Sequence, residues 1–489
     1  MPVPDGVKPV LPLWAAVVVA AASGPIIDAG FPDKGIWPLT FVGVGLVLLS
    51  LIGRRAGSAL LVGFVGGVAF YFTHIQWASL FLGPLPMSAL AVLESLFFAA
   101  GALAITLAYR WIPRAFPTTL GRVGLLPVAV AGLWTAREAW AAVWPYGGFS
   151  WGRMGMSLSD SPFAPLYAWL GISGVSFVIV LIAALVVQVT REVGVDPLVR
   201  ASLPVALVGL VLIVPAWPVD DAGTLRVAAV QGNGKAGYFD SRQPGDLLQA
   251  QLDATAPLFG TDVDVVLWPE GSSDYSPVDD PYTAQVFDYV SEQLNAPFVT
   301  WAVTQRGEKT YNTSILWESG KGIVDYYDKR HPVPFGEYIP DRAFWRPFAP
   351  DLIDLVGREY TPGTTDMVFD INGTKVGINI CFDIVDDQLL TESVEQGAQA
   401  ILAIASCWAD SSVQQLAIVD SDVLDRFGVD TIELGRGFAL GDEWWADWVL
   451  PDGSPCQVPV WALPERDGSR WVIRSRRTGR VIAQMPDGA

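Results

Sequence analysis

The sequence is poor in charged residues, in histidine and in cysteine. Only 17% of its 489 residues are charged, against about 25% in an average soluble domain. Of the two histidines, His74 and His331, the first falls in a long apolar run, so a Ser-His-Asp arrangement is not expected. The three cysteines, Cys381, Cys407 and Cys456, have no metal-ligand spacing and form no even disulfide set. We therefore expect no metal site and no cofactor.

Basic residues are also scarce, because 31 Lys and Arg stand against 50 Asp and Glu, for a net charge of −19. A surface that binds nucleic acid needs a basic face for the phosphates, so nucleic acid is not an expected partner. The charged residues gather after residue 220, and long apolar runs fill the chain before it. We expect a membrane-embedded helical domain in residues 1–220 and a soluble domain in residues 221–489.

The apolar runs of residues 1–220 predict a helical bundle with about seven transmembrane helices. Most runs approach the roughly 20 residues that cross a bilayer core, and Pro, Gly and aromatic residues mark their ends. The predicted spans are residues 10–27, 36–52, 58–80, 88–111, 123–144, 163–189 and 201–217. A cleaved signal peptide is the alternative for the first span, because residues 20–24 are small as in a cleavage region.

The arginines of residues 1–220 predict the orientation of these spans. They cluster after the second, fourth and sixth spans, at Arg54, Arg55, Arg110, Arg114, Arg122, Arg191 and Arg200. Short loops rich in Lys and Arg stay in the cytoplasm, so the amino terminus and the even-numbered exits are expected there. An odd number of spans then places the second domain on the extracytoplasmic face.

From residue 225 onward, short apolar runs alternate with polar, helix-like segments. The predicted strands are residues 225–230, 263–268, 297–302, 313–317, 322–327, 375–380 and 400–405, and the predicted helices are 246–256, 282–294 and 387–396. This alternation predicts an α/β domain of sheets covered by helices. Residues 232–237 match G-x-G-x-x-G, but no helix is predicted directly after the third glycine, so a dinucleotide site is not expected.

Three predicted strands end on residues that together suit acyl transfer: Glu270, Lys329 and Cys381. A thiol ionises near pH 8.5, so a cysteine nucleophile needs a base and a cation beside it. Glu270 is predicted to be the base, and Lys329 to stabilise the thiolate and the later oxyanion. A single buried cysteine is more often a small core residue, but three such strand ends in one domain favour a shared site.

Several motifs make the chain resemble a known family. They are P-Y-G-G-F-S-W-G-R, V-Q-G-N, L-W-P-E-G-S-S-D, K-R-H-P-V-P-F-G-E-Y-I-P, I-C-F-D, S-V-Q-Q-L-A-I and I-E-L-G-R, between about residues 140 and 436. The second half resembles the nitrilase superfamily, which carries a Glu-Lys-Cys triad in an αββα sandwich. The whole layout, a membrane bundle followed by a nitrilase-like domain, resembles the apolipoprotein N-acyltransferase family.

The resemblance implies roles for ten residues. The implied catalytic residues are Glu270 as general base, Lys329 as the partner of the thiolate and oxyanion, and Cys381 as the nucleophile. The implied supporting residues are Glu337, Phe382 and Asp383, of which Glu337 helps to hold the lysine. Residues expected to contact substrate are Phe239, Tyr338, Trp151 and Arg153. Trp151 and Arg153 lie in a loop that could equally be an interfacial aromatic belt.

The resemblance also implies the reaction and its place. Cys381 would take an acyl chain from a phospholipid, and the N-terminal amine of a diacylglyceryl-modified apolipoprotein would accept that chain from the thioester. The expected location is the bacterial inner (plasma) membrane, with several spans and an extracytoplasmic catalytic domain. Residues 334–350 are rich in aromatic side chains and are hypothesised to form a lid at the lipid interface, with ordinary loop packing as the alternative.

The sequence departs from this family in its last third. Residues 405–410 replace paired asparagines, residues 439–448 replace an expected Ser-Thr-x-Gly-x-Ser strand, and the polar carboxyl-terminal segment replaces a final membrane span. Two other functions therefore stay open at this point. One is a membrane-anchored amidase of the nitrilase type, in which water replaces the lipoprotein amine, and the other is a non-catalytic membrane scaffold.

Overall fold

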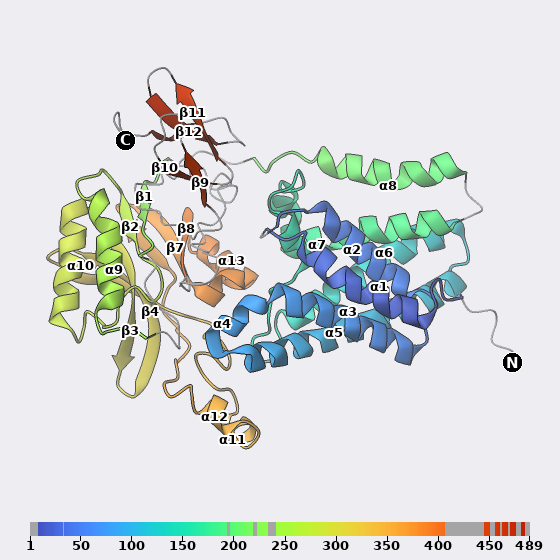
Figure 1. Ribbon diagram of the computed structural model, residues 1–489, viewed down its shortest axis with the longest axis horizontal. Coiled ribbons are helices and arrows are strands. Elements are labelled where there is room, and N and C mark those ends of the chain that lie inside the picture. The colour runs from blue at the N-terminus through green and yellow to red at the C-terminus, as the bar shows by residue number, and fades with distance from the viewer. Residues whose placement is uncertain are drawn as a thin grey trace. The chain divides into compact units, whose positions relative to one another are not determined.

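A computed structural model describes residues 8–32, 34–192, 196–218, 223–232 and 241–405 of the chain, together with the backbone of five later strands. Those strands are β9 (Trp445–Val449), β10 (Pro455–Pro459), β11 (Ala462–Asp467), β12 (Arg470–Ser475) and β13 (Val481–Gln484). The chain divides into two compact units, Met1–Pro218 and Val219–Ala489. The first unit is helical and the second contains both sheets and helices (Figure 1).

The first unit consists of helices that follow the predicted apolar runs. They are α1 (Leu13–Asp28), α2 (Pro38–Leu51), α3 (Ala56–His74), α4 (Ser79–Leu82), α5 (Pro84–Ala115), α6 (Leu126–Ala141), α7 (Leu166–Arg191) and α8 (Pro197–Leu212). The third predicted span, residues 58–80, was too long: α3 ends at His74, and a 3₁₀ turn and α4 follow. Within α7 the backbone breaks at Gly171, whose φ of 63° is not helical.

Three helices of the described chain, α3, α5 and α7, are long and apolar enough to cross a membrane. The helices α1 and α2 and the segment Arg200–Leu212 are apolar but shorter. The helix α6 carries two buried charged residues, Arg137 and Glu138, which is uncommon in lipid-facing segments. Length and composition thus support three spans, and the number seven stays a prediction.

The first sheet of the second unit contains β1 (Val227–Ala229), β2 (Val265–Leu267), β3 (Phe298–Arg306), β4 (Lys309–Glu318) and β5 (Gly322–Asp328), in that order. The strands β1, β2 and β3 are parallel, and β4 and β5 continue the sheet in antiparallel pairs. The helices α9 (Asp246–Thr255) and α10 (Pro281–Leu294) cover one face (Figure 1). Both begin within one residue of the predicted helices.

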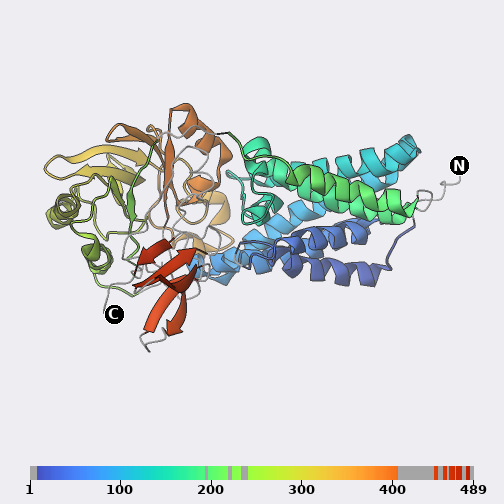
Figure 2. The same cartoon turned by 90° about the horizontal axis from the view of Figure 1, so that it is seen from above.

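The second sheet contains β6 (Val368–Ile371), β7 (Thr374–Ile380) and β8 (Ala400–Ile404). The strand β7 pairs antiparallel with β6 and parallel with β8. The helix α13 (Asp387–Glu395) covers its outer face, so the layers run helix, sheet, sheet, helix (Figures 1 and 2). This is an αββα sandwich.

Alternating residues of the short strands explain why these layers stay together. Val227, Val265 and Leu267 pack in one core with residues of β7 and β8, whereas Ala228 and Val266 pack in another core with residues of α9 and α10. Successive side chains of a strand point to opposite faces. A strand buried on both faces reads as a continuous apolar run, which is the pattern that the sequence has here.

Candidate active site

The order of the strands brings Glu270 and Lys329 to one edge of the first sheet. Because β4 runs antiparallel between β3 and β5, β5 points the same way as β2 and β3. Glu270 follows β2 by three residues, and Lys329 directly follows β5. The backbone N–H of Lys329 donates to the carbonyl oxygen of Asn312 on β4 at 2.8 Å. Lys329 and Asn312 are therefore neighbours across the β4–β5 pair.

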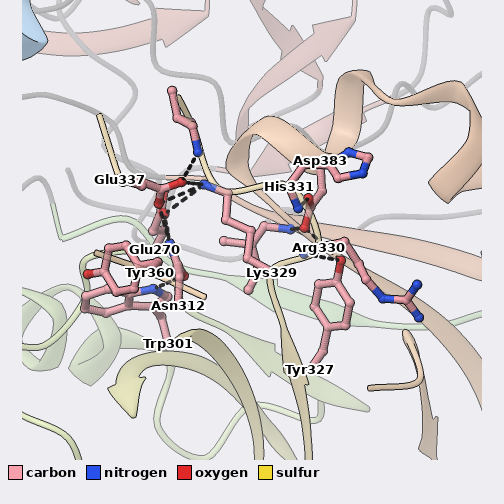
Figure 3. Close-up of polar contacts among 12 residues, drawn as sticks. Glu270, Trp301, Asn312, Tyr327, Lys329, Arg330, His331, Glu337, Tyr360 and Asp383 are labelled. Atoms are coloured by element: carbon pink, nitrogen blue, oxygen red, sulfur yellow. Dashed lines mark hydrogen bonds and ion pairs between the residues drawn. The ribbon is translucent and has the colours of Figure 1, made fainter. Parts of the chain in front are cut away.

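The ammonium of Lys329 lies between two carboxylates (Figure 3). Its Nζ is 2.9 Å from Oε2 of Glu337 and 3.7 Å from Oε1 of Glu270. The side-chain amide of Asn312 donates to Oε1 of Glu270 at 2.7 Å and to Oε1 of Glu337 at 2.8 Å. The indole N–H of Trp301 donates to Oδ1 of Asn312 at 2.6 Å and thereby fixes which end of the amide faces the carboxylates. Lys329 is 1% exposed, so its charge is balanced inside the protein.

A tight turn returns Glu337 to the lysine. The backbone N–H of Glu337 donates to the carbonyl of Val333 at 2.8 Å, and the N–H of Val333 donates to Oε2 of Glu337 at 2.6 Å. The N–H of Phe335 donates to the carbonyl of Tyr338 at 2.7 Å. Tyr338, an expected substrate contact, is half-buried beside this turn.

Cys381 lies at the junction between β7 and a 3₁₀ turn that spans Cys381–Val385. Its φ is +49°, in the left-handed region that costs a residue with a side chain about 1–3 kcal/mol and is found mainly at functional sites. This sharp change of direction leaves the thiol at the end of the strand and half-buried. The predicted strand thus ends, as expected, next to Cys381, and the backbone of Cys381 itself is strained.

The charges around the thiol explain its resting state. Burial lowers the pKa of Lys329, but the nearby acidic groups, Glu337 before Glu270, outweigh burial and raise that pKa well above its usual value. Burial raises the pKa of Cys381, and the charge of Glu270 raises it further, against the lowering effect of Lys329. These shifts favour the ammonium form of Lys329 and the protonated form of the Cys381 thiol. A carboxylate beside such a thiol can take its proton as the sulfur attacks a carbonyl carbon.

The other supporting residues follow the thiol directly. Asp383 is 0% exposed and accepts hydrogen bonds from the hydroxyl of Tyr327 at 2.8 Å and from the backbone N–H of His331 at 2.9 Å. Burial raises the pKa of Asp383, while the ammonium of Lys329 lowers it. Phe382 is half-buried in the same turn.

The remaining expected substrate contacts lie in the helical unit or outside the described residues. Trp151 and Arg153 lie in the helical unit, where Trp151 stacks on Phe149 with ring centres 5.5 Å apart and Arg153 is buried. The N–H of Met154 donates to Oε1 of Glu138 on α6 at 3.2 Å and anchors this loop. Phe239 lies outside the described residues, as do residues 406–444, which contain part of the divergent region, and all but the first residue of the G-x-G-x-x-G match.

Sequence reasoning missed several residues of the site. Trp301, Asn312 and Tyr327 lie on β3, β4 and β5, respectively, and nothing in the sequence of these strands distinguishes them from neighbouring polar and aromatic residues. Tyr360 was also missed: its N–H donates to the carbonyl of Glu337 at 2.9 Å. Burial raises the pKa of Tyr360 to about 12, against the lowering effect of Arg358.

Comparison with known proteins identifies the family. The sequence profile described as "Apolipoprotein N-acyltransferase N-terminal domain" matches residues 23–185, and that described as "Carbon-nitrogen hydrolase" matches residues 226–418. An apolipoprotein N-acyltransferase of Mycolicibacterium smegmatis is 30% identical over 84% of this chain and 73% of the relative. The chain belongs to the apolipoprotein N-acyltransferase family. An apolipoprotein N-acyltransferase of Photobacterium profundum is 25% identical over 81% of this chain and 78% of that relative.

Membership of the apolipoprotein N-acyltransferase family confirms the predicted resemblance and makes the chain an acyltransferase enzyme. The carbon-nitrogen hydrolase profile also confirms a nitrilase-like second domain. Among solved structures, an amidase from Nesterenkonia aligns with 55% of this chain and 89% of the amidase, at 13% identity and a TM-score of 0.32. In the part of the chain that the structure describes, no group of three or more His, Cys, Asp or Glu residues is arranged to hold a metal ion.

Proposed function

We propose that this enzyme moves an acyl chain from a membrane phospholipid to the N-terminal amine of a diacylglyceryl-modified apolipoprotein, through a thioester on Cys381. The observation that carries the proposal is the buried ammonium of Lys329, held 3.7 Å from Oε1 of Glu270 next to a thiol on a strained turn. The charges of Glu270 and Lys329 both act on the thiol of Cys381, which supports a shared site for a nucleophile, a base and an oxyanion partner.

In the first step the sulfur of Cys381 attacks the ester carbonyl of the phospholipid. Glu270 takes the thiol proton, and Lys329 stabilises the oxyanion that forms. When the carbon–oxygen bond of the ester breaks, protonated Glu270 returns the proton to the leaving alkoxide. The products are a thioester and a lysophospholipid.

In the second step the amine of the apolipoprotein attacks the thioester carbonyl. Lys329 again stabilises the oxyanion, Glu270 accepts the proton that the amine loses, and the carbon–sulfur bond breaks. The thiolate recovers its proton from Glu270, so the enzyme returns to its starting state. A thioester reacts readily with an amine, whereas the amide product is stable, which drives the transfer forward.

The supporting residues hold these groups in place. Glu337 accepts from Lys329 and, with Asn312, keeps the ammonium aimed at the pocket. Asp383 braces the turn that bears the nucleophile, and Phe382 forms part of the acyl pocket next to it. The proposed substrate contacts are Tyr338 in the catalytic domain, Phe239, and the pair Trp151 and Arg153 in the helical domain.

We place the enzyme in the bacterial inner membrane with seven spans and the catalytic domain outside. Three helices have the length and apolarity to span a bilayer, and the arginines cluster after alternate predicted spans. A membrane location suits the reaction, because a phospholipid donor and a lipid-modified acceptor both reside in the bilayer.

The deciding experiment incubates the purified enzyme with phospholipid that carries a labelled acyl chain. We expect a hydroxylamine-sensitive label on Cys381, which moves to a synthetic diacylglyceryl-cysteine peptide when that peptide is added. A label that is released only to water would favour the amidase. The absence of any label would overturn the acyl-transfer mechanism and favour a scaffold.

The proposed lid, residues 334–350, exposes two large aromatic side chains. Phe344 in the short helix α11 (Arg342–Trp345) is 58% exposed, and Phe348 is 73% exposed. Their ring centres are 5.5 Å apart. In contrast, Phe335 and Trp345 pack against a small core beneath them.

We expect Phe344→Ser with Phe348→Ser to lower acylation from phospholipid vesicles about tenfold. A tenfold effect corresponds to about 1.4 kcal/mol, and the apolar area of two aromatic rings that enter a membrane is worth at least that free energy. Acylation from a short-chain, water-soluble ester should change less than twofold. Initial rates with the two donors measure the difference. The control is Tyr282→Ser on α10, which removes an aromatic residue of 60% exposure far from the loop in sequence. Equal losses with both donors would contradict a lid.

A further inference from the structure

Two segments of the catalytic domain contact each other. They are Tyr327–His331, which carries Lys329, and Cys381–Glu392. We infer that His331 and Asp386 form a positioning pair that holds the lysine segment against the turn that bears the nucleophile. The inference rests on the proposed roles of Lys329 and Cys381. Nothing in the acyl-transfer steps above uses the side chain of either member of the pair.

The backbone of His331 is already fixed by the nucleophile turn. Its N–H donates to Oδ1 of Asp383 at 2.9 Å, and Tyr327 donates to the same carboxylate from the other end of the lysine segment. Figure 3 shows these contacts as one group and the contacts of Glu337, Glu270 and Asn312 as another, with Lys329 between them. A shift of either segment would therefore change the position of Lys329.

The side chain of His331 adds a second tie to the same segment. Its Nδ1 is 2.7 Å from Oδ2 of Asp386, five residues after the nucleophile. Through its other oxygen, Asp386 accepts the N–H of Gln388 at 2.8 Å and so caps α13. One carboxylate thus joins the lysine segment to the helix that follows the nucleophile turn. Arg330 makes a weaker parallel contact, 3.8 Å from Glu392 of that helix.

The charges around the imidazole favour its protonated form. The hydrogen bond to Asp386 raises the pKa of His331 above 6.5, burial lowers it, and the charges of Asp386 and Asp383 raise it while that of Arg330 lowers it. The pair is therefore complete below this pKa and weakens as the pH rises through it. Acyl transfer should then lose rate over the same pH range, because Lys329 is held less firmly.

Asp386→Asn removes the ion pair with His331 but keeps the cap of α13, because asparagine caps a helix as well as aspartate does. We expect kcat to fall about tenfold, within the loss that small errors in position cause, while KM for the phospholipid changes less than twofold. The inflection assigned to His331 should move to lower pH, and the melting temperature should change little. His331→Arg should keep the wild-type kcat and lose the inflection, because arginine stays charged.

The control variant is Glu318→Gln, which removes an exposed ion pair with Lys321 at the β4–β5 turn; its kcat and pH profile should match the wild type. An Asp386→Asn enzyme with wild-type kcat and an unshifted pH profile would overturn the inference, as would a loss of kcat in His331→Arg equal to that in Asp386→Asn. If the wild-type enzyme itself forms no acyl adduct, the proposed mechanism fails instead, so the two failures are distinct.

Discussion

Cys381→Ala will form no acyl adduct and will lower acyl transfer by at least about 10⁴-fold, because removal of a covalent nucleophile removes the whole two-step route. The side chain is half-buried and ends a strand, so loss of one sulfur atom should leave the fold intact. Alanine must adopt the same φ of +49°, and the strain of the turn is therefore unchanged. Labelled phospholipid followed by gel analysis measures the adduct, and peptide acylation measures the transfer.

Cys381→Ser is the matched control for geometry. A hydroxyl has nearly the size of the thiol but gives up its proton far less readily, so we expect no detectable transfer from this variant either. Both variants keep Cys407 and Cys456. A hydroxylamine-sensitive label that persists in Cys381→Ala would place the thioester on another cysteine and contradict the assignment.

Lys329→Met will lower acyl transfer by about 10²–10³-fold, the usual effect of removing an oxyanion donor, and will also destabilise the protein. The ammonium is 1% exposed and balances Glu337 at 2.9 Å and Glu270 at 3.7 Å. Removing one member of a buried ion pair typically costs about 3–5 kcal/mol, because the remaining charge has no partner. We expect a melting temperature about 10 °C lower, measured in detergent by thermal unfolding.

The double variant Lys329→Met with Glu337→Gln separates stability from chemistry. It removes one of the two unpaired carboxylates, so it should regain part of the lost stability, with a coupling of about 1–3 kcal/mol. It should regain no activity, since no cation faces the oxyanion. Recovery of acyl transfer in the double variant would show that Lys329 serves only to neutralise Glu337.

The proposed catalytic residues could be predicted from sequence because each one follows a recognisable strand. Glu270, Lys329 and Cys381 follow short apolar runs, and such runs identify buried strands by their composition alone. Asn312 was not accessible in this way. It lies inside β4 and bridges both carboxylates, and the sequence shows only one more polar residue in a strand.

The membrane half was predicted less well for a physical reason. Hydropathy finds apolar helices, but it does not fix where a helix stops: α3 ends at His74, inside a run that stays apolar through Leu80. At that end, Nδ1 of His74 lies 3.0 Å from Oδ1 of Asp28, and the imidazole ring stacks on Phe70. Such an ending depends on contacts between helices, which a window of sequence does not contain.

The sequence by itself determined the division into a helical part and a part with sheets covered by helices, because hydropathy and strand patterns are properties of neighbouring residues. Its motifs also carried the family resemblance, which implied the αββα class and the proposed roles of the thiol, carboxylate and ammonium. Only the tertiary structure decided that Lys329 is held between two carboxylates, that Asn312 joins them and that His331 reaches Asp386. These contacts join residues from different strands and turns, and their energies depend on burial and distance. Those quantities exist only after the two sheets have packed together.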